Sequence, residues 1–186
     1  MHKDISHIKN QKTFVMIKPD GVQRWLVGEI IRRFENKWLI LEDIRITQPK
    51  PEDVYRHYPS EDNEWITRLW HKSLETFKQA NINPQEHLGT WDPTEIGKKV
   101  LGFLVSYISS WKCVMMIRSW ANVLDTARKL VGWTIPANAD IWTIRWDYSN
   151  DTAFIANIEG RPLQNLIHAS ENETEAVNEI ALRFGK

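Results

Sequence analysis

The sequence predicts an α+β protein, a ferredoxin-like sandwich in which helices cover a four-stranded, mainly antiparallel sheet. Short apolar runs that stop at turn residues alternate with longer segments that repeat apolar residues at helical spacing. The predicted order is strand, helix, strand, helices, strand, helix, long loop, strand, helix. Because crossovers between strands are right-handed, this order places two helices over one face of the sheet.

The first half of the predicted fold starts with the run TFVMI at residues 13–17, a buried strand that stops at the turn residues KPDG at 18–21. Apolar residues at helical spacing predict a helix over residues 26–37. Residues 39–47 alternate apolar and polar side chains as a second strand, with a slip in the alternation that suits a β-bulge. A proline followed by two acidic residues predicts a short helix over residues 51–58.

The middle of the chain contains a polar and aromatic stretch at residues 60–100, which predicts a helical insertion on a single domain that spans residues 1–186. After it, residues 100–110 repeat apolar side chains as an amphipathic helix. Residues 112–118 are the third predicted strand, and residues 122–132 are a helix that ends at a glycine.

The last part of the chain starts with residues 133–164, which contain two prolines and little periodicity and therefore predict a long functional loop. A short strand-like run follows at residues 165–169. Residues 170–184 predict the last helix, with Ser170 and Glu173 at the spacing of a capping box.

Charge and composition argue against several classes of protein. The chain has 24 basic and 24 acidic residues, so it lacks the broad positive surface of a nucleic-acid-binding or membrane-surface protein. The single cysteine, Cys113, lies in an apolar run and fits a core thiol in a reduced intracellular protein. The amino-terminal segment lacks the apolar stretch of a secretory signal, and we therefore expect a cytoplasmic protein.

His168 is the first candidate for chemistry, because it comes shortly before the predicted last helix. Amide donors and the helix dipole at such a position favour negative charge, so a phosphate could bind there. Taken alone, the plainer interpretation is a histidine that ends a buried strand. Lys18 before its turn, Arg128 on a helix and Arg145 in the loop equally fit solvated surface charges.

Five motifs change this weighing when they are taken together and in order. They are TFVMIKPDGVQR, VGEIIRRFE, RKLVGWTIPA, TIRWDYS and NLIHASENETEAVNEI. The chain resembles the nucleoside diphosphate kinase family in these motifs, across nearly its whole length. The resemblance implies that the protein transfers the terminal phosphate of a nucleoside triphosphate such as ATP to a nucleoside diphosphate. It also implies a ping-pong mechanism through a phosphohistidine.

The resemblance assigns a role to each matching position. His168 would be the nucleophile, Glu179 would orient its ring through the other ring nitrogen, and Ser170 would lie near the transferred phosphate. An unperturbed imidazole is largely neutral near pH 7, as a nucleophile requires. Lys18 and Tyr58 complete the catalytic set that the resemblance implies, since Tyr58 matches a tyrosine near the catalytic histidine and lysine. The positions that match the family's nucleotide-binding residues are Lys18, Val100, Arg128, Thr134, Arg145 and Asn165.

Within that set, the matched roles differ. Lys18, Arg128, Thr134 and Arg145 would hold phosphates, and Asn165 would reach toward the sugar. Val100 falls where the family places the aromatic residue on which the base stacks, and Phe103 follows nearby in the sequence.

The resemblance also implies a cofactor and partners. Mg²⁺ would be held mainly through the phosphates of the nucleotide, so no protein metal motif is expected. The expected partners are nucleoside di- and triphosphates and further copies of the chain in a tetramer or hexamer. Neither nucleic acid nor a membrane is expected as a partner.

The counts of glycine and tryptophan are unusual. Average usage of about 7% predicts roughly 13 glycines for this length, whereas the chain has 8 glycines and 10 tryptophans. The family's pattern carries glycine at six tryptophan positions, namely Trp25, Trp38, Trp111, Trp120, Trp142 and Trp146. We hypothesise that the gene comes from a cell that reads one codon as glycine, UGA being the first candidate, and that tryptophan stands in its place here.

Two other interpretations remain open. The tryptophans could be genuine in a catalytically impaired relative that acts as a nucleotide-binding or protein-interaction module, since exposed aromatic patches mark interaction sites. Every matched catalytic residue is retained, which argues against lost chemistry. An RNA-binding ferredoxin-like domain would stack bases on aromatic residues, but the chain lacks the aromatic sheet motif and a surplus of basic residues.

Overall fold

The computed structural model describes residues 10–58, 62–79 and 81–186. The chain divides into two compact units. The first, which we call the sheet unit, contains the described residues up to Thr47 together with Lys112–Ser149 and Asn165–Lys186. The second, the helical unit, contains Gln48–Trp111 and Asn150–Gln164.

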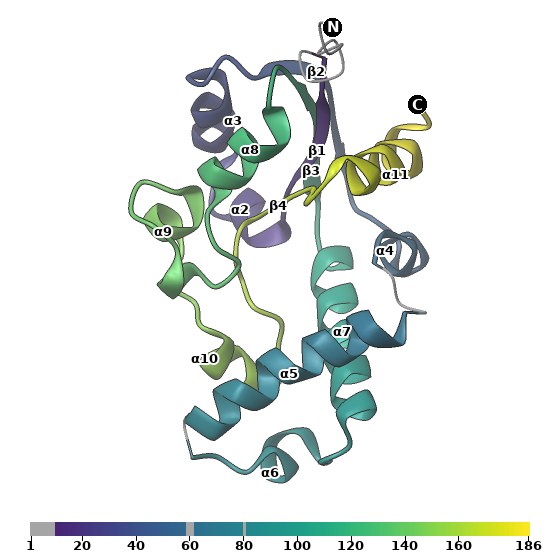
Figure 1. Ribbon diagram of the computed structural model, residues 1–186, viewed down its shortest axis with the longest axis vertical. Helices are drawn as coiled ribbons and strands as arrows, with labels where there is room; N and C mark the ends of the chain where they lie inside the picture. The colour runs from purple at the N-terminus through teal and green to yellow at the C-terminus, as the bar shows by residue number, and fades with distance from the viewer. Residues whose placement is uncertain (1–9, 59–61, 80) are drawn as a thin grey trace, which may run out of the picture. The chain divides into compact units, whose positions relative to one another are not determined.

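The sheet unit is built on one four-stranded antiparallel sheet in the order β2-β3-β1-β4 (Figure 1). Its strands are β1 (Lys12–Ile17), β2 (Ile40–Thr47), β3 (Cys113–Ser119) and β4 (Ile167–Ala169). The register shifts between Leu41 and Asp43, at the slip in the alternation of β2. Strand order, antiparallel pairing and the covering helices confirm the predicted ferredoxin-like α+β sandwich.

Helices cover both faces of this sheet. They are α2 (Pro19–Gln23), α3 (Val27–Glu35), α8 (Val123–Val131), α9 (Ile144–Tyr148) and α11 (Glu173–Phe184), with a 3-10 turn η1 (Pro136–Asn138). Val15 and Ile17 on β1 belong to the apolar cluster that contains residues of α3 and α8. Phe14, on the other face of β1, packs edge-on against Phe184 of α11. Alternate residues of one strand therefore anchor helices on opposite sides of the sheet. Figure 1 shows α3 and α8 on one side and α11 on the other.

The helical unit contains α4 (Pro51–His57), α5 (Asn63–Gln79), α6 (Pro84–Leu88), α7 (Pro93–Ser109) and α10 (Ala153–Ile158). Its core cluster is formed by Phe77, Leu88 and Ile96. α5 and α7 approach closely at Gly97, where a Cβ atom would lie 2.6 Å from the carbonyl oxygen of Ile66. Helices α5 and α6 lie within the stretch expected as an insertion at residues 60–100.

Three local predictions are wrong. The segment 133–164 is not one irregular loop, because it contains η1, α9 and α10. The KPDG segment is not only a turn, since α2 begins at Pro19. The capping box at Ser170 and Glu173 is replaced by an N-cap at Asn172, whose side chain accepts a hydrogen bond from the backbone N–H of Glu175. The short helices α9 and α10 have no apolar period to read, and side-chain N-caps at Thr143 and Thr152 mark where they begin.

Cys113 has the predicted place. It is fully buried on β3, and burial raises the pKa of its thiol to about 12. No helix in the described part of the chain is both long enough and apolar enough to span a lipid bilayer.

Candidate active site

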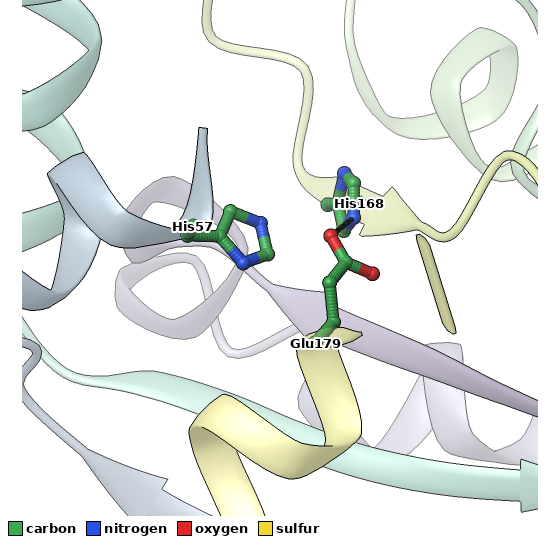
Figure 2. Close-up of side chains that lie close together, drawn as sticks. All are labelled: His57, His168 and Glu179. Carbon is green, nitrogen blue, oxygen red and sulfur yellow. Dashed lines mark hydrogen bonds and ion pairs between the residues drawn. The ribbon is translucent and has the colours of Figure 1, made fainter. Parts of the chain in front are cut away.

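β4 presents His168 to α11. The strand pairs with β1 alone, and Met16 lies opposite His168 in the register. Figure 2 shows the ring of His168 and the side chain of Glu179 pointing toward each other, and the Nε2 to Oε1 distance is 2.7 Å. His57, also drawn in Figure 2, belongs to α4 of the helical unit.

The electrostatic surroundings keep His168 neutral. Burial lowers the pKa of its imidazole to about 3, and the positive charges of Lys18, Arg145 and Arg128 act in the same direction against the opposing charge of Glu175. A neutral imidazole has one N–H and one lone pair. Because Glu179 accepts from Nε2–H, the lone pair lies on Nδ1.

Glu179 is itself held in place. It is buried at the inner face of α11, and its second carboxylate oxygen accepts a hydrogen bond of 2.6 Å from the hydroxyl of Ser170. The Ser170 hydroxyl oxygen also accepts from the backbone N–H of Phe14 at 3.2 Å. The structure therefore places Ser170 beside the carboxylate that orients His168.

Lys18, Asn165 and Thr134 form a second group of contacts in the sheet unit. The Lys18 ammonium donates to Asn165 Oδ1 at 2.7 Å, and the Asn165 amide donates to the backbone carbonyl of Thr134 at 2.8 Å. Burial lowers the pKa of Lys18 to about 8, with a further contribution from Arg145. The lysine is thus a buried cation held by an amide, a kind of group that can receive an anion.

Arg145 is buried and binds the backbone on both sides of Leu166. Its guanidinium donates to the carbonyl oxygens of Asn165 at 3.2 Å, Gly132 at 2.8 Å and Ile167 at 2.6 Å. A guanidinium has five N–H donors. These three bonds place a positive charge beside β4 and at the same time hold the segment that leads to His168.

The remaining predicted residues lie farther out or in the other unit. Arg128 is on α8 with its side chain 45% exposed, and its guanidinium is 3.9 Å from the carboxylate of Glu171. Tyr58 and Val100 belong to the helical unit. Tyr58 stacks on Trp65 with ring centroids 5.6 Å apart, and Val100 packs against the core cluster of that unit. The residues predicted from the sequence therefore fall into two sets, one in the sheet unit and one, Tyr58 and Val100, in the helical unit.

Sequence reasoning did not assign two carboxyl groups of the sheet unit, Asp20, which is buried, and Glu175, which is half-buried. Asp20 accepts a hydrogen bond from the backbone N–H of Leu166, two residues before His168. Burial raises the pKa of Glu175, and the neighbouring charge of Glu179 raises it further. The aspartate of the KPDG motif was a usable signal for the first, whereas Glu175 had none.

The fold and this site together define a class of protein, an α+β enzyme that presents a neutral histidine beside buried cationic side chains. The sequence profile of the family described as nucleoside diphosphate kinase matches residues 11–83 and 63–186. The chain belongs to the nucleoside diphosphate kinase family and is a phosphotransferase.

Known relatives agree with this family. A nucleoside diphosphate kinase from Pyrobaculum aerophilum is 40% identical over 174 residues, which cover 94% of each chain. The solved structure of an NDP kinase from the same organism has a TM-score of 0.91 at 39% identity, covering 94% of this chain and 96% of that chain. A Borrelia burgdorferi nucleoside-diphosphate kinase, solved as a transition-state mimic with vanadate and ADP, has a TM-score of 0.74 at 26% identity, covering 95% and 88%.

Proposed function

We propose that the protein transfers the terminal phosphate of ATP or another nucleoside triphosphate to a nucleoside diphosphate through a phosphohistidine at His168. The single observation that carries this proposal is the pair of His168 and Glu179, 2.7 Å apart, with the pKa of the imidazole lowered by burial. A neutral imidazole whose Nε2–H is engaged has its lone pair on Nδ1, where it can act as a nucleophile.

The reaction then takes two balanced steps. The Nδ1 lone pair attacks the terminal phosphorus, an N–P bond forms, and the bond to the bridging oxygen breaks so that the nucleoside diphosphate leaves. A second nucleoside diphosphate attacks the same phosphorus with its terminal oxygen, and the N–P bond breaks to release a triphosphate. The first step leaves His168 phosphorylated and the second returns it to its starting form, which is the basis of ping-pong kinetics.

Glu179 and the cations have different parts in these steps. The imidazole becomes positive when Nδ1 takes the phosphoryl group, and the buried carboxylate beside Nε2–H stabilises that charge. Lys18, Arg128 and Arg145 would neutralise phosphate oxygens, since phosphoryl transfer depends on position and charge. Asn165 is held by Lys18 and would contact the sugar, while Thr134 would assist at the phosphates.

Mg²⁺ fits this site as an ion that arrives with the nucleotide. The carboxylates of Glu179 and Asp20 already accept hydrogen bonds from protein donors, and the remaining groups around His168 include the cations Lys18 and Arg145. The ion would therefore take its oxygen ligands mainly from phosphates, where it screens their charge. From the protein itself, the ammonium of Lys18 would screen the same phosphate charge.

The substrates and the assembly have support of their own. The Borrelia burgdorferi structure contains ADP and the Halobacterium salinarum nucleoside diphosphate kinase was solved with CDP, which supports nucleotides as ligands. Edge strand β2 exposes Ile40, Ile44 and Ile46, which supports a homo-oligomer, expected as a tetramer or hexamer. A cytoplasmic location stays a prediction.

Labelling with γ-³²P ATP tests the proposal. The protein should take up acid-labile, alkali-stable label that maps to His168, and unlabelled GDP should discharge it as GTP. His168→Ala should abolish labelling and lower exchange between ATP and GDP by at least about 1000-fold. His87→Ala is the matched control, because His87 is exposed on α6.

A second candidate, a catalytically impaired binding module, has a different outcome. Such a protein would bind nucleotide in calorimetry yet take up no label. Normal exchange by His168→Ala would contradict the histidine mechanism altogether.

A further inference from the structure

Leu166 has an unusual backbone conformation beside the catalytic histidine. Its φ is +67°, and the backbone N–H of Ile167 donates to the carbonyl oxygen of Asn165 at 2.7 Å. Together these features make a three-residue γ-turn, a rare and strained form for a branched side chain. Such a conformation persists only where the surroundings hold it.

The KPDG segment supplies that hold from both sides of Leu166. The backbone N–H of Lys18 donates to the carbonyl oxygen of Leu166 at 2.8 Å. The carboxylate of Asp20 accepts from the N–H of Leu166 at 3.1 Å. At Gly21, a Cβ atom would lie 3.2 Å from the same carbonyl oxygen, so a side chain there would crowd the contact. One short segment thus fixes both peptide groups of Leu166.

The sheet alone fixes β4 weakly. β4 is three residues long, lies at the edge of the sheet and, among the strands that the structure describes, pairs only with β1. Leu166 stands between two site residues, with Asn165 on one side holding Lys18 and His168 two positions later. A loss of the left-handed turn would therefore move Asn165 and His168 relative to Lys18.

We propose that Asp20 is a positioning residue for phosphoryl transfer, which it serves by holding Leu166 in the left-handed conformation. Asp20 is buried, and its carboxylate accepts a hydrogen bond from the backbone N–H of the strained residue, Leu166, itself. The inference rests on the proposed role of His168, and it assigns to Asp20 no contact with substrate.

Single-turnover phosphorylation by γ-³²P ATP tests this role. Asp20→Ala should slow formation of phosphohistidine by about 10- to 100-fold, with a smaller change in the ATP concentration that gives half-maximal rate. Asp20→Ala combined with Leu166→Gly should recover much of the rate, because glycine adopts positive φ without strain. Asp92→Ala is the matched control, since Asp92 accepts a backbone N–H at 2.9 Å at the start of α7.

A second measurement separates this inference from the proposed function. ¹⁵N NMR of the imidazole should show that the Nε2–H form bonded to Glu179 is lost or broadened in Asp20→Ala and restored by Leu166→Gly, whether or not label is taken up. Absence of label in the unaltered protein would overturn the proposed function. An unchanged imidazole spectrum and unchanged labelling in Asp20→Ala would overturn the positioning role, as would failure of the glycine rescue.

An independent observation concerns the tryptophans. The same two backbone hydrogen bonds recur at four helix ends. In each, the N–H of one residue donates to the carbonyl oxygen three positions earlier, and the N–H of the next residue donates to the carbonyl oxygen five positions before itself. The residues with positive φ in these four turns are Trp25 (60°), Trp38 (62°), Asn81 (54°) and Gly160 (60°).

Two of these four residues suit the turn and two do not. Glycine and asparagine enter the left-handed region readily, whereas a tryptophan there is strained by its Cβ. Trp25 and Trp38 are 92% and 77% exposed, so no burial offsets that strain. Trp142 repeats the conflict with φ of +69° and 80% exposure, at the third position of a turn closed by Thr143 N–H to Asp140 O at 3.2 Å. Turns with positive φ there use glycine or asparagine.

We infer that Trp25, Trp38 and Trp142 occupy positions whose positive φ suits glycine and not tryptophan. We infer also that the organism's own protein has glycine at these three positions, because its ribosomes read as glycine the codon that is translated here as tryptophan. Trp111, Trp120 and Trp146, which the structure also describes, have no positive φ, so the backbone argument covers three of the six sites. A partner-binding role for exposed indoles would account for their exposure but not for the left-handed backbone beneath them.

Thermal unfolding and the gene itself test this inference. Replacing Trp25, Trp38 and Trp142 together by glycine should raise Tm, by roughly 2–4 °C for each site. Trp111→Gly, at an exposed site without positive φ, should not raise Tm. UGG codons at the three sites, tryptophan in the corresponding peptides of protein from the source cells, or a triple variant no more stable than its parent would each overturn the inference.

Discussion

The sheet unit and the helical unit differ in how they use buried polar side chains. Of the polar and charged residues that are buried in the described part of the chain, all but Asn157 belong to the sheet unit. Burial of polar groups lowers stability unless they are hydrogen-bonded. In the sheet unit these bonds join distant segments, such as Lys18 to Asn165 and Ser170 to Glu179.

The helical unit has a simpler organisation. An apolar cluster and the close approach at Gly97 hold its helices together, and Asp92 and Thr152 cap α7 and α10. An ion pair in it, Arg161 with Asp151 at 2.6 Å, joins residues only ten positions apart. The comparison shows that the buried polar side chains of the described part of the chain are concentrated in the sheet unit, which also contains His168.

The largest test of this difference compares two arginines. Arg145→Ala leaves three carbonyl groups around β4 without their charged donor, so phosphohistidine formation should fall by about 1000-fold and the free energy of unfolding by about 3 kcal/mol. Arg161→Ala should lower the free energy of unfolding by about 1 kcal/mol and leave the labelling rate within about 3-fold. Urea unfolding and single-turnover labelling measure both. Equal losses for the two variants would contradict the contrast between the units.

Glu179→Gln tests the role of the carboxylate beside His168 in the sheet unit. The amide oxygen can still accept from His168 Nε2–H, but the negative charge that stabilises the phosphorylated imidazole is gone. Labelling should slow by about 100-fold while the protein stays folded by circular dichroism. Ser170→Ala, which leaves that charge in place, should have the smaller effect, and the reverse order would count against the assigned roles.

The pH dependence of stability gives a third test. His168 has a folded pKa of about 3 against an ordinary value of 6.5, so between these values the unfolded chain binds a proton that the folded protein does not. Stability should therefore fall as pH falls through this window, by up to about 1.4 kcal/mol per pH unit. His168→Gln should flatten the slope. Urea unfolding at several pH values measures this slope, and identical slopes in the two proteins would contradict the lowered pKa of His168.

The smallest expected effects concern Tyr58 and Val100 of the helical unit. If Tyr58 lies near the catalytic histidine and lysine and Val100 lies at the base, as the resemblance implies, Tyr58→Phe and Val100→Ala should each change the KM for ADP by about 3-fold and kcat by less. Steady-state exchange with ADP and dADP measures both parameters. A 100-fold loss of kcat in either variant would place essential chemistry in the helical unit and break the comparison.

Much of the fold could be predicted from the sequence alone. β1 and β3 are continuous apolar runs and α3 and α11 repeat apolar residues at helical spacing, so local hydrophobic pattern was enough to find them. The short helices α2, α9 and α10 were not predicted, because five or six residues are too few to show a helical repeat of apolar side chains. Motif resemblance supplied His168 and Glu179, which the structure brings to 2.7 Å.

Tertiary structure alone decided the partners of the site. Asp20 and Leu166 lie 146 residues apart, and no local pattern signals that their contact holds a left-handed turn. Arg145 resembled a phosphate ligand in sequence, while its guanidinium binds three carbonyl oxygens that only the folded sheet unit brings together. Hydrophobic periodicity is a property of neighbouring residues, whereas hydrogen-bond partners across a sheet are fixed only when distant segments pack and exclude water.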